Sequence, residues 1–263
     1  MAIPLFHVDA FTSQPFAGNP AAVCPLESWL DEATLRAVAA ENNLSETAYF
    51  VPCGEHHELR WFTPRCEVKL CGHATLASAF VLFNILEPAR DTVQFKTRHS
   101  GMLTVCRDGN RLAMDFPALP LHSCSHPPAD LFVGLGSPSS RPVLQHQDKY
   151  FVVYDSEDEI RGVEPDFSQL EKLHPAAVAI TAPGSDADFV SRYFAPSYGV
   201  PEDPVTGSAH CSLAPYWGER LAKKRLHARQ LSSRGGEIWC EWAGDRLIIT
   251  GDAVLTLRGS LLI

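Results

Sequence analysis

The sequence lacks the features that mark several large protein classes. Its eight cysteines in 263 residues contain no CxxC pair and fall far below the density of a disulfide scaffold. Basic residues number 22 against 31 acidic ones, so the net charge of −9 gives no reason to expect a nucleic-acid or anionic-membrane partner. The longest nearly apolar run, residues 74–86, is too short to span a bilayer. No basic segment leads into an apolar stretch at the N-terminus, so we expect no secretory signal and a cytoplasmic protein with reduced thiols.

Motifs for bound nucleotides and metals are also missing. The sequence has no GxGxxG, GxxxxGK[ST], HExxH or GxSxG pattern. Cys66 and Cys71 precede His73, but a fourth ligand is lacking and zinc sites commonly use tighter spacing. The acidic and histidine cluster at residues 55–58 is typical of a solvated loop. We therefore expect no metal and no cofactor.

The hydrophobic periodicity indicates a mixed α and β protein with 45% hydrophobic residues. The main helices are expected over residues 30–42, 73–83 and 207–221, with a short one over 167–173, and Pro215 is expected to bend or limit the third. Residues 117–147, rich in Pro, Ser and His, are expected to form a linker and irregular loops. Strands are expected over residues 4–10, 21–24, 47–52, 58–62, 92–96, 101–107, 111–116, 150–154, 177–181, 189–194, 228–231, 237–242, 246–250 and 254–257.

The two halves of the chain repeat each other. Arg60–Pro64 reads RWFTP and Arg192–Pro196 reads RYFAP. Downstream, the pattern Glu-x-x-x-Cys-Gly-His-Ala at 67–74 matches Glu-x-x-x-Thr-Gly-Ser-Ala at 202–209. This predicts an internal duplication, with domains over residues 1–116 and 117–263 whose last few residues return to the first domain. Two such halves would face each other most simply about a pseudo-two-fold axis, with a cleft between them.

Each repeated glycine stands where an apolar helix is expected to begin. Gly72 and Gly207 let a ligand approach the backbone closely, and the first amides of a helix have no intrahelical partner. Two such helix starts would bind anions, carboxylates first among them. The alternative is that both glycines simply make tight turns.

Four residues near these positions could do chemistry. His73 and Ser208 follow the two glycines, and Asp203 precedes the second by four residues. Glu46 stands at the start of an apolar strand. Desolvation there would raise the pKa of its carboxyl group towards the working pH, which would suit it to act as a general base. A surface charge at Glu46, a locally bonded His73 and a turn carboxylate at Asp203 are the alternatives that the residues alone leave open.

These motifs together resemble the PhzF-like, or phenazine biosynthesis-like, isomerase family. The resemblance is carried in chain order by DAF at 9–11, FAGNPAAV at 16–23, LSETA at 44–48, RWFTP at 60–64, EVKLCGHATLA at 67–77, RYFAP at 192–196 and EDPVTGSAH at 202–210. It implies an α+β, diaminopimelate epimerase-like fold. That fold has two pseudo-symmetric domains, each a mainly antiparallel β-barrel around a central helix, with the active site between them.

The resemblance also implies an activity and a site. The reaction would be a cofactor-independent proton shift between carbons of a small carboxylate substrate. Glu46 would move the proton, with His73 and Asp203 completing the catalytic set. The substrate-binding set that the resemblance implies comprises Gly72, Gly207, Ser208, Asn19, Cys71 and Thr206. The oligomeric state is left open, with a homodimer as the candidate. The phenazine precursor is a substrate candidate by analogy only.

One departure separates this chain from the epimerase relatives, which place a cysteine before each glycine. Here the first position is Cys71 and the second is Thr206, whose hydroxyl is too weak an acid and base to replace a thiol. Two-base stereoinversion is therefore disfavoured. The alternatives are an amino-acid racemase or epimerase that uses Cys71, and a non-catalytic relative that binds a small acid or a protein.

Overall fold

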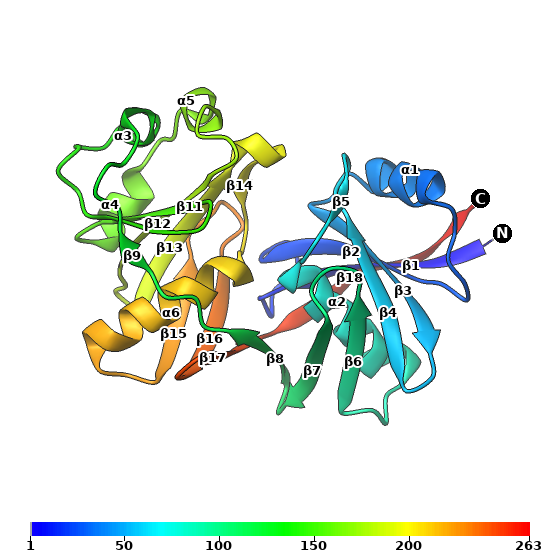
Figure 1. The fold of residues 1–263 in the computed structure, drawn as a ribbon. Helices are drawn as coiled ribbons and strands as arrows, with labels where there is room; N and C mark the ends of the chain where they lie inside the picture. The colour runs from blue at the N-terminus through cyan, green and yellow to red at the C-terminus, as the bar shows by residue number, and fades with distance from the viewer. Residues whose placement is uncertain (1) are drawn as a thin grey trace. The chain divides into compact units, whose positions relative to one another are not determined.

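The computed structural model describes residues 2–263, and the chain divides into two compact units (Figure 1). The first unit contains Met1–Asp115 together with Thr250–Ile263, and the second contains Phe116–Ile249. The last strand of the chain therefore belongs with the first strands, where it pairs antiparallel with β1.

Unit 1 is a curved run of strands around one buried helix. Strands β1 to β4 and β6 to β8 follow one another in chain order, with parallel steps only at β2–β3 and β4–β6. Helix α2 is buried along almost its whole length because its residues are nearly all small or apolar. The bounds are β1 Ala2–Ala10, β2 Asn19–Pro25, α1 Glu32–Asn42, β3 Glu46–Cys53, β4 His56–Phe62, β5 Glu67–Val68, α2 Gly72–Val81, the π-helical turn η1 Leu82–Leu86, β6 Thr92–Thr97, β7 Met102–Asp108, β8 Arg111–Pro117 and β18 Ala253–Leu262.

Unit 2 is built in the same way around α6. Strands β9 to β13, β15 and β16 pair in chain order, with parallel steps at β11–β12 and β13–β15. The bounds are β9 His122–Ser123, α3 Ala129–Leu135, β10 Val143–His146, β11 Lys149–Val153, α4 Glu157–Gly162, α5 Phe167–Glu171, β12 Ala177–Pro183, β13 Phe189–Ala195, the 3-10 turn η2 Pro196–Tyr198, β14 Val200–Asp203, α6 Gly207–Leu221, β15 Arg225–Gln230, β16 Gly236–Ala243 and β17 Arg246–Gly251.

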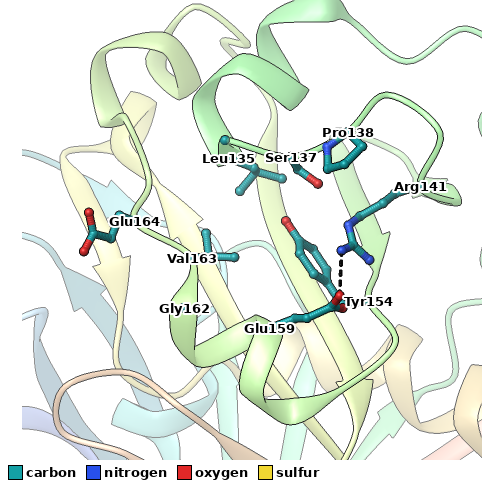
Figure 2. Close-up of a pocket in the computed structure, with 10 residues that line it drawn as sticks. Leu135, Ser137, Pro138, Arg141, Tyr154, Glu159, Gly162, Val163 and Glu164 are labelled. Atoms are coloured by element: carbon teal, nitrogen blue, oxygen red, sulfur yellow. Dashed lines mark ion pairs between the residues drawn. The ribbon is translucent and has the colours of Figure 1, made fainter.

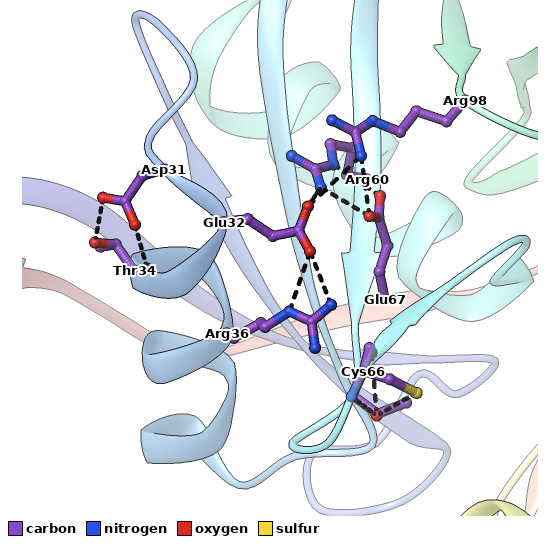
Figure 3. Close-up of polar contacts among 9 residues, drawn as sticks. Asp31, Glu32, Thr34, Arg36, Arg60, Cys66, Glu67 and Arg98 are labelled. Atoms are coloured by element: carbon purple, nitrogen blue, oxygen red, sulfur yellow. Dashed lines mark hydrogen bonds and ion pairs between the residues drawn. The ribbon is translucent and has the colours of Figure 1, made fainter.

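The repeated sequence motifs adopt the same local structure in each unit. Phe62 pairs with Glu67 in unit 1, as Phe194 pairs with Glu202 in unit 2. Arg60 Nε and Nη2 donate to the two oxygens of Glu67, both at 2.7 Å (Figure 3). Arg192 makes the same two-point contact with Glu202, at 2.8 and 3.0 Å. Each arginine thus ties a central strand to the short strand that leads into the buried helix.

The structure corrects two expectations of secondary structure. Residues 117–147 are not merely linker and loops, because they contain α3, β9 and β10. Pro215 neither ends nor shortens α6, which runs continuously over Gly207–Leu221. Proline cannot donate to the carbonyl of Cys211, and the amide of Leu119 donates to that oxygen instead, at 2.9 Å.

The cores of the units are formed by apolar residues from their own strands and helices. In unit 1, Leu35 and Val38 of α1 pack with Tyr49 and Phe62 of the neighbouring strands.

In the residues that the structure describes, no helix has both the length and the apolar character needed to cross a membrane.

Candidate active site

Three of the expected site residues of unit 1 meet at the start of α2. Glu46 Oε2 lies 3.0 Å from His73 Nε2, and both side chains are largely buried, with 15% and 6% of their surface exposed. Cys71 Sγ lies 3.5 Å from the other ring nitrogen of His73. The imidazole therefore stands between a carboxylate and a thiol.

Strand pairing and helix geometry position this cluster. Glu46 is the first residue of β3 and pairs with Ala21 of the parallel strand β2. Asn19, another expected site residue, is fully buried two positions earlier on β2. Cys71 is the N-cap of α2, but its side chain makes no capping hydrogen bond. The amides at the start of this helix are therefore available to an anion.

Burial and charge shift the protonation of two groups in this cluster. Burial disfavours the imidazolium of His73, but the neighbouring Cys71 and Glu46 outweigh it and hold the pKa of His73 above its usual range. Burial, with the charge of Glu46, raises the pKa of Cys71 to about 11. At neutral pH the thiol of Cys71 is therefore protonated, and the raised pKa of His73 favours its charged form.

The same three side chains form the one set of ligand atoms, within residues 2–263, close enough to hold a metal ion. The ligand atoms of Glu46, Cys71 and His73 all lie within 4.8 Å of one another. Zinc binds this mixture of carboxylate, thiolate and imidazole. Cys66 takes no part in this set, because it is exposed and its sulfur contacts Thr63.

Unit 2 gathers its expected residues at the start of α6. Thr206 occupies the N-cap position of this helix without a capping side-chain bond, and its hydroxyl donates instead to Asp203 Oδ2 at 2.5 Å. Gln230 fixes this loop, because its amide nitrogen donates to the Asp203 carbonyl at 2.7 Å and its oxygen accepts from the Thr206 amide at 2.8 Å. Ser208 is the second residue of α6, and its Oγ accepts a hydrogen bond from Lys149 Nζ at 3.3 Å.

A pocket in unit 2 holds none of these residues. It has a volume of about 440 Å³ and is lined by residues 135–138, Arg141, Tyr154, Glu159 and 162–164 (Figure 2). The Arg141 guanidinium lies 4.1 Å from the centre of the Tyr154 ring and pairs with Glu159 at 3.1 Å.

A family model described as phenazine biosynthesis-like protein, PhzC-PhzF, matches residues 8–259. The chain belongs to this family. An uncharacterized isomerase of Pseudomonas aeruginosa is 51% identical, over 99% of both chains. The crystal structure of a PhzF family protein from Enterococcus faecalis superposes with a TM-score of 0.95, at 44% identity and over all of both chains.

The comparisons confirm the fold class expected for a PhzF family member. A hydroxyproline epimerase from Agrobacterium vitis, crystallised with trans-4-hydroxy-L-proline, has a TM-score of 0.63 at 11% identity, over 99% of this chain and 92% of that one. That likeness extends the fold to the epimerases. The names of the sequence relatives indicate an isomerase type of activity.

Sequence reasoning missed two polar residues of this PhzF family member. Gln230 is buried in β15 and holds the Asp203–Thr206 loop, and Lys149 begins β11 and contacts Ser208. Neither lies in a repeated motif, and each is more than 20 residues away along the chain from the group that it contacts. Nothing near either residue in the sequence names its partner, because Gln230 ends a strand rich in polar residues and Lys149 stands at the edge of an apolar one.

Proposed function

We propose that the protein is a cofactor-independent isomerase that shifts a proton between two carbons of a small carboxylate substrate. Glu46 removes the proton from a carbon made acidic by a neighbouring unsaturated or carbonyl group. The electron pair of the broken C–H bond moves into that group, and Glu46 returns the proton to a second carbon. No net oxidation, reduction or group transfer takes place.

The contact between Glu46 and His73 is the observation that carries this proposal. A buried imidazolium 3.0 Å from the Glu46 carboxylate holds that carboxylate in place for proton transfer. His73 is therefore proposed to orient Glu46 and to relay its proton.

Other expected residues are assigned to binding. The amides at Gly72 and Gly207 begin helices that lack a side-chain cap, so they are proposed to bind carboxylate and developing negative charge. Thr206 and Ser208 are proposed to contact the substrate in unit 2, and Asn19 and Cys71 in unit 1, while Asp203 stays a proposed member of the catalytic set.

An amino-acid racemase or epimerase that uses Cys71 is the second candidate. It is favoured by the 3.5 Å contact between the thiol and His73. Two features argue against it. The pKa of Cys71 is about 11, which leaves the thiol protonated at neutral pH, and Thr206, whose hydroxyl bonds Asp203, stands where a second thiol would be needed.

Substitution of the two acid–base candidates distinguishes these mechanisms. A panel of small unsaturated carboxylates and amino acids is incubated in heavy water, and deuterium incorporation is followed by NMR. Glu46→Gln keeps the size of the side chain but removes the ionisable group, so exchange should slow by about 10² to 10⁴. Cys71→Ser should slow it by less than about tenfold, and the product should carry deuterium without racemisation.

Glu41→Gln is the matched control, because Glu41 is exposed on α1. It should leave the exchange rate unchanged. An inactive Cys71→Ser beside an active Glu46→Gln would overturn the isomerase proposal and support the racemase. Binding of a panel member without exchange by the wild type would support a non-catalytic protein.

A further inference from the structure

The side-chain amide of Gln230 makes three hydrogen bonds to the loop that leads into α6. Gln230 is the last residue of β15, and only 1% of its surface is exposed. Its Oε1 accepts from the Thr206 backbone amide at 2.8 Å, and its Nε2 donates to the Asp203 carbonyl at 2.7 Å. A backbone amide can only donate and a carbonyl can only accept, so these two contacts fix which end of the side chain is the nitrogen.

The third contact determines where the hydroxyl proton of Thr206 goes. Gln230 Nε2 lies 3.2 Å from Thr206 Oγ1. An amide nitrogen has no acceptor, so the hydroxyl oxygen must accept there, and its one hydrogen is left for Asp203 Oδ2, at 2.5 Å. A chain of donors therefore runs from Gln230 through Thr206 to the carboxylate, and it restrains the rotation of the Asp203 side chain.

Unit 1 carries a different residue at the position that corresponds to Gln230. On β13, Gln230 pairs with the residue just before the arginine of RYFAP, and on β4, Thr97 pairs with the residue just before the arginine of RWFTP. Thr97 is also buried, but its hydroxyl donates to the carbonyl of Gly101 in its own turn, at 2.9 Å. The shared strand arrangement is therefore completed in unit 1 without a glutamine.

The other two members of the chain of donors also differ between the units. The repeated motifs align Asp203 with Val68 and Thr206 with Cys71. Valine has no polar side chain, and the sulfur of Cys71 lies beside the ring of His73. The three aligned positions thus hold Asp, Thr and Gln in unit 2, and Val, Cys and Thr in unit 1. The hydrogen-bonded set accompanies Asp203, a proposed catalytic residue, rather than the architecture that the units share.

We propose that Gln230 is a positioning residue of the active site, which acts through Thr206 to hold the Asp203 carboxylate in the orientation that the reaction uses. The inference rests on the proposed function for the catalytic role of Asp203, whereas the orientation itself can be observed without turnover. Gln230 needs no contact with the substrate for this task. The task also gives a reason for a threonine at position 206, since a thiol is a weaker hydrogen-bond donor than a hydroxyl.

Crystal structures of variants of the full-length protein, without substrate, test the orientation. Gln230→Met keeps the length of the side chain but removes its donor and acceptor, and Thr206→Val keeps the shape of threonine but removes the hydroxyl. In both variants the Asp203 carboxylate should adopt another rotamer, while α6 keeps its place. Thr206→Ser, which restores the donor, should restore the wild-type rotamer.

The deuterium-exchange assay separates positioning from binding. Gln230→Met and Thr206→Val should each lower the exchange rate at saturating substrate by about tenfold or more, with KM changed by less than about threefold. Thr206→Ser should recover most of the rate that Thr206→Val loses. In the double variant the second substitution should cost less than about twofold, because it breaks a chain that is already broken. Gln145→Met is the matched control, because Gln145 is exposed on β10 of the same unit.

Each result supports or overturns the positioning role. An unchanged Asp203 rotamer in both variants, a loss confined to KM, or additive losses in the double variant would overturn it. If Gln230→Met fails to fold, as judged by thermal unfolding, Gln230→Asn replaces it, because its shorter side chain cannot span the same contacts. A wild type without exchange on any panel member would overturn the isomerase, while the crystal structures would still decide the orientation. Wild-type exchange rates in variants with a turned carboxylate would overturn the positioning role alone.

Discussion

At the scale of single residues, the proposed chemistry of unit 1 depends on the pair Glu46 and His73. Either side chain alone would be expensive to bury, because each has a charged form. Together they compensate each other at 3.0 Å, and the nearby thiol of Cys71 stays neutral. The proposed function uses this pair as an acid–base group beside the helix amides.

The pH dependence of stability tests the protonation state of His73. Its pKa in the folded protein is raised, so the folded state binds this proton more tightly than the unfolded state does. The stabilisation is fully present below the unfolded pKa of about 6.5 and is lost as the pH rises through the folded value. Between pH 6 and 8.5, urea unfolding should show the wild type losing stability relative to His73→Gln.

A second variant separates the contribution of the carboxylate. In Glu46→Gln, the relative loss between pH 6 and 8.5 should be smaller, because one of the groups that raises the pKa of His73 is gone. Parallel stability curves for the wild type and His73→Gln over this range would contradict a charged His73.

At the scale of elements, the two buried helices α2 and α6 share one feature at their N-termini, although the residues there differ. Both begin without a side-chain cap, so their first amides stay available to a ligand. Helix α6 also carries a polar side chain, His210, that is fully buried. Its Nδ1 lies 2.9 Å from the Thr206 carbonyl, one turn earlier. Burial lowers the pKa of His210 to about 4, so it is neutral in the folded protein.

His210 should make unit 2 sensitive to acid. Its folded pKa of about 4 lies below the unfolded value of about 6.5, so the unfolded state binds the proton more tightly between these values. Its contribution is intact above pH 6.5 and falls as the pH falls, by about 3 kcal/mol at pH 4. Urea unfolding between pH 7 and 4, followed by tryptophan fluorescence, should show this loss in the wild type.

His210→Gln is the comparison that isolates this group. It should be less stable than the wild type at pH 7, but it should lack the His210 part of the acid-dependent loss. An equal loss of stability in both proteins from pH 7 to pH 4 would show that His210 does not carry it.

At the scale of the whole molecule, the chain closes its first unit with its last strand. Strand β18 pairs antiparallel with β1 from Ala2 to Ala10, although nearly the whole chain separates them. Strand β1 is therefore an inner strand with a partner on each side, β18 and β2. Without β18, its hydrogen-bonding edge would be exposed.

Removal of Ala253–Ile263 should consequently destabilise unit 1 selectively. Hydrogen-exchange mass spectrometry should show faster exchange in β1 and β2, with strands β12 and β13 of unit 2 unchanged. Removal of Leu262 and Ile263 alone should have little effect, since their side chains are 84% and 49% exposed. Unchanged protection of β1 in the longer truncation would show that β18 is dispensable.

Much of the local structure could be predicted because its causes lie close together in the sequence. The apolar runs after Gly72 and Gly207 predicted both buried helices, and α6 begins and ends where expected. Asp31 caps α1, and Asn43 ends it in the left-handed conformation that asparagine tolerates. Residues 117–147 were misjudged because Pro and Ser mark turns but do not exclude short helices and strands between them. The internal duplication stays a prediction, although the repeated arginine–glutamate pairs agree with it.

The sequence by itself determined most of the elements, the repeated motifs and the family, since each depends on neighbours a few residues apart. The tertiary structure decided which polar side chains meet. Glu46 and His73 are 27 residues apart, and Lys149 and Ser208 are 59 apart. Their contacts follow from the parallel steps β2–β3 and β11–β12, which bring strand starts beside helix starts. Parallel strands are joined by long connections rather than by tight turns, so no local turn signal in the sequence sets which residues of the two strands pair.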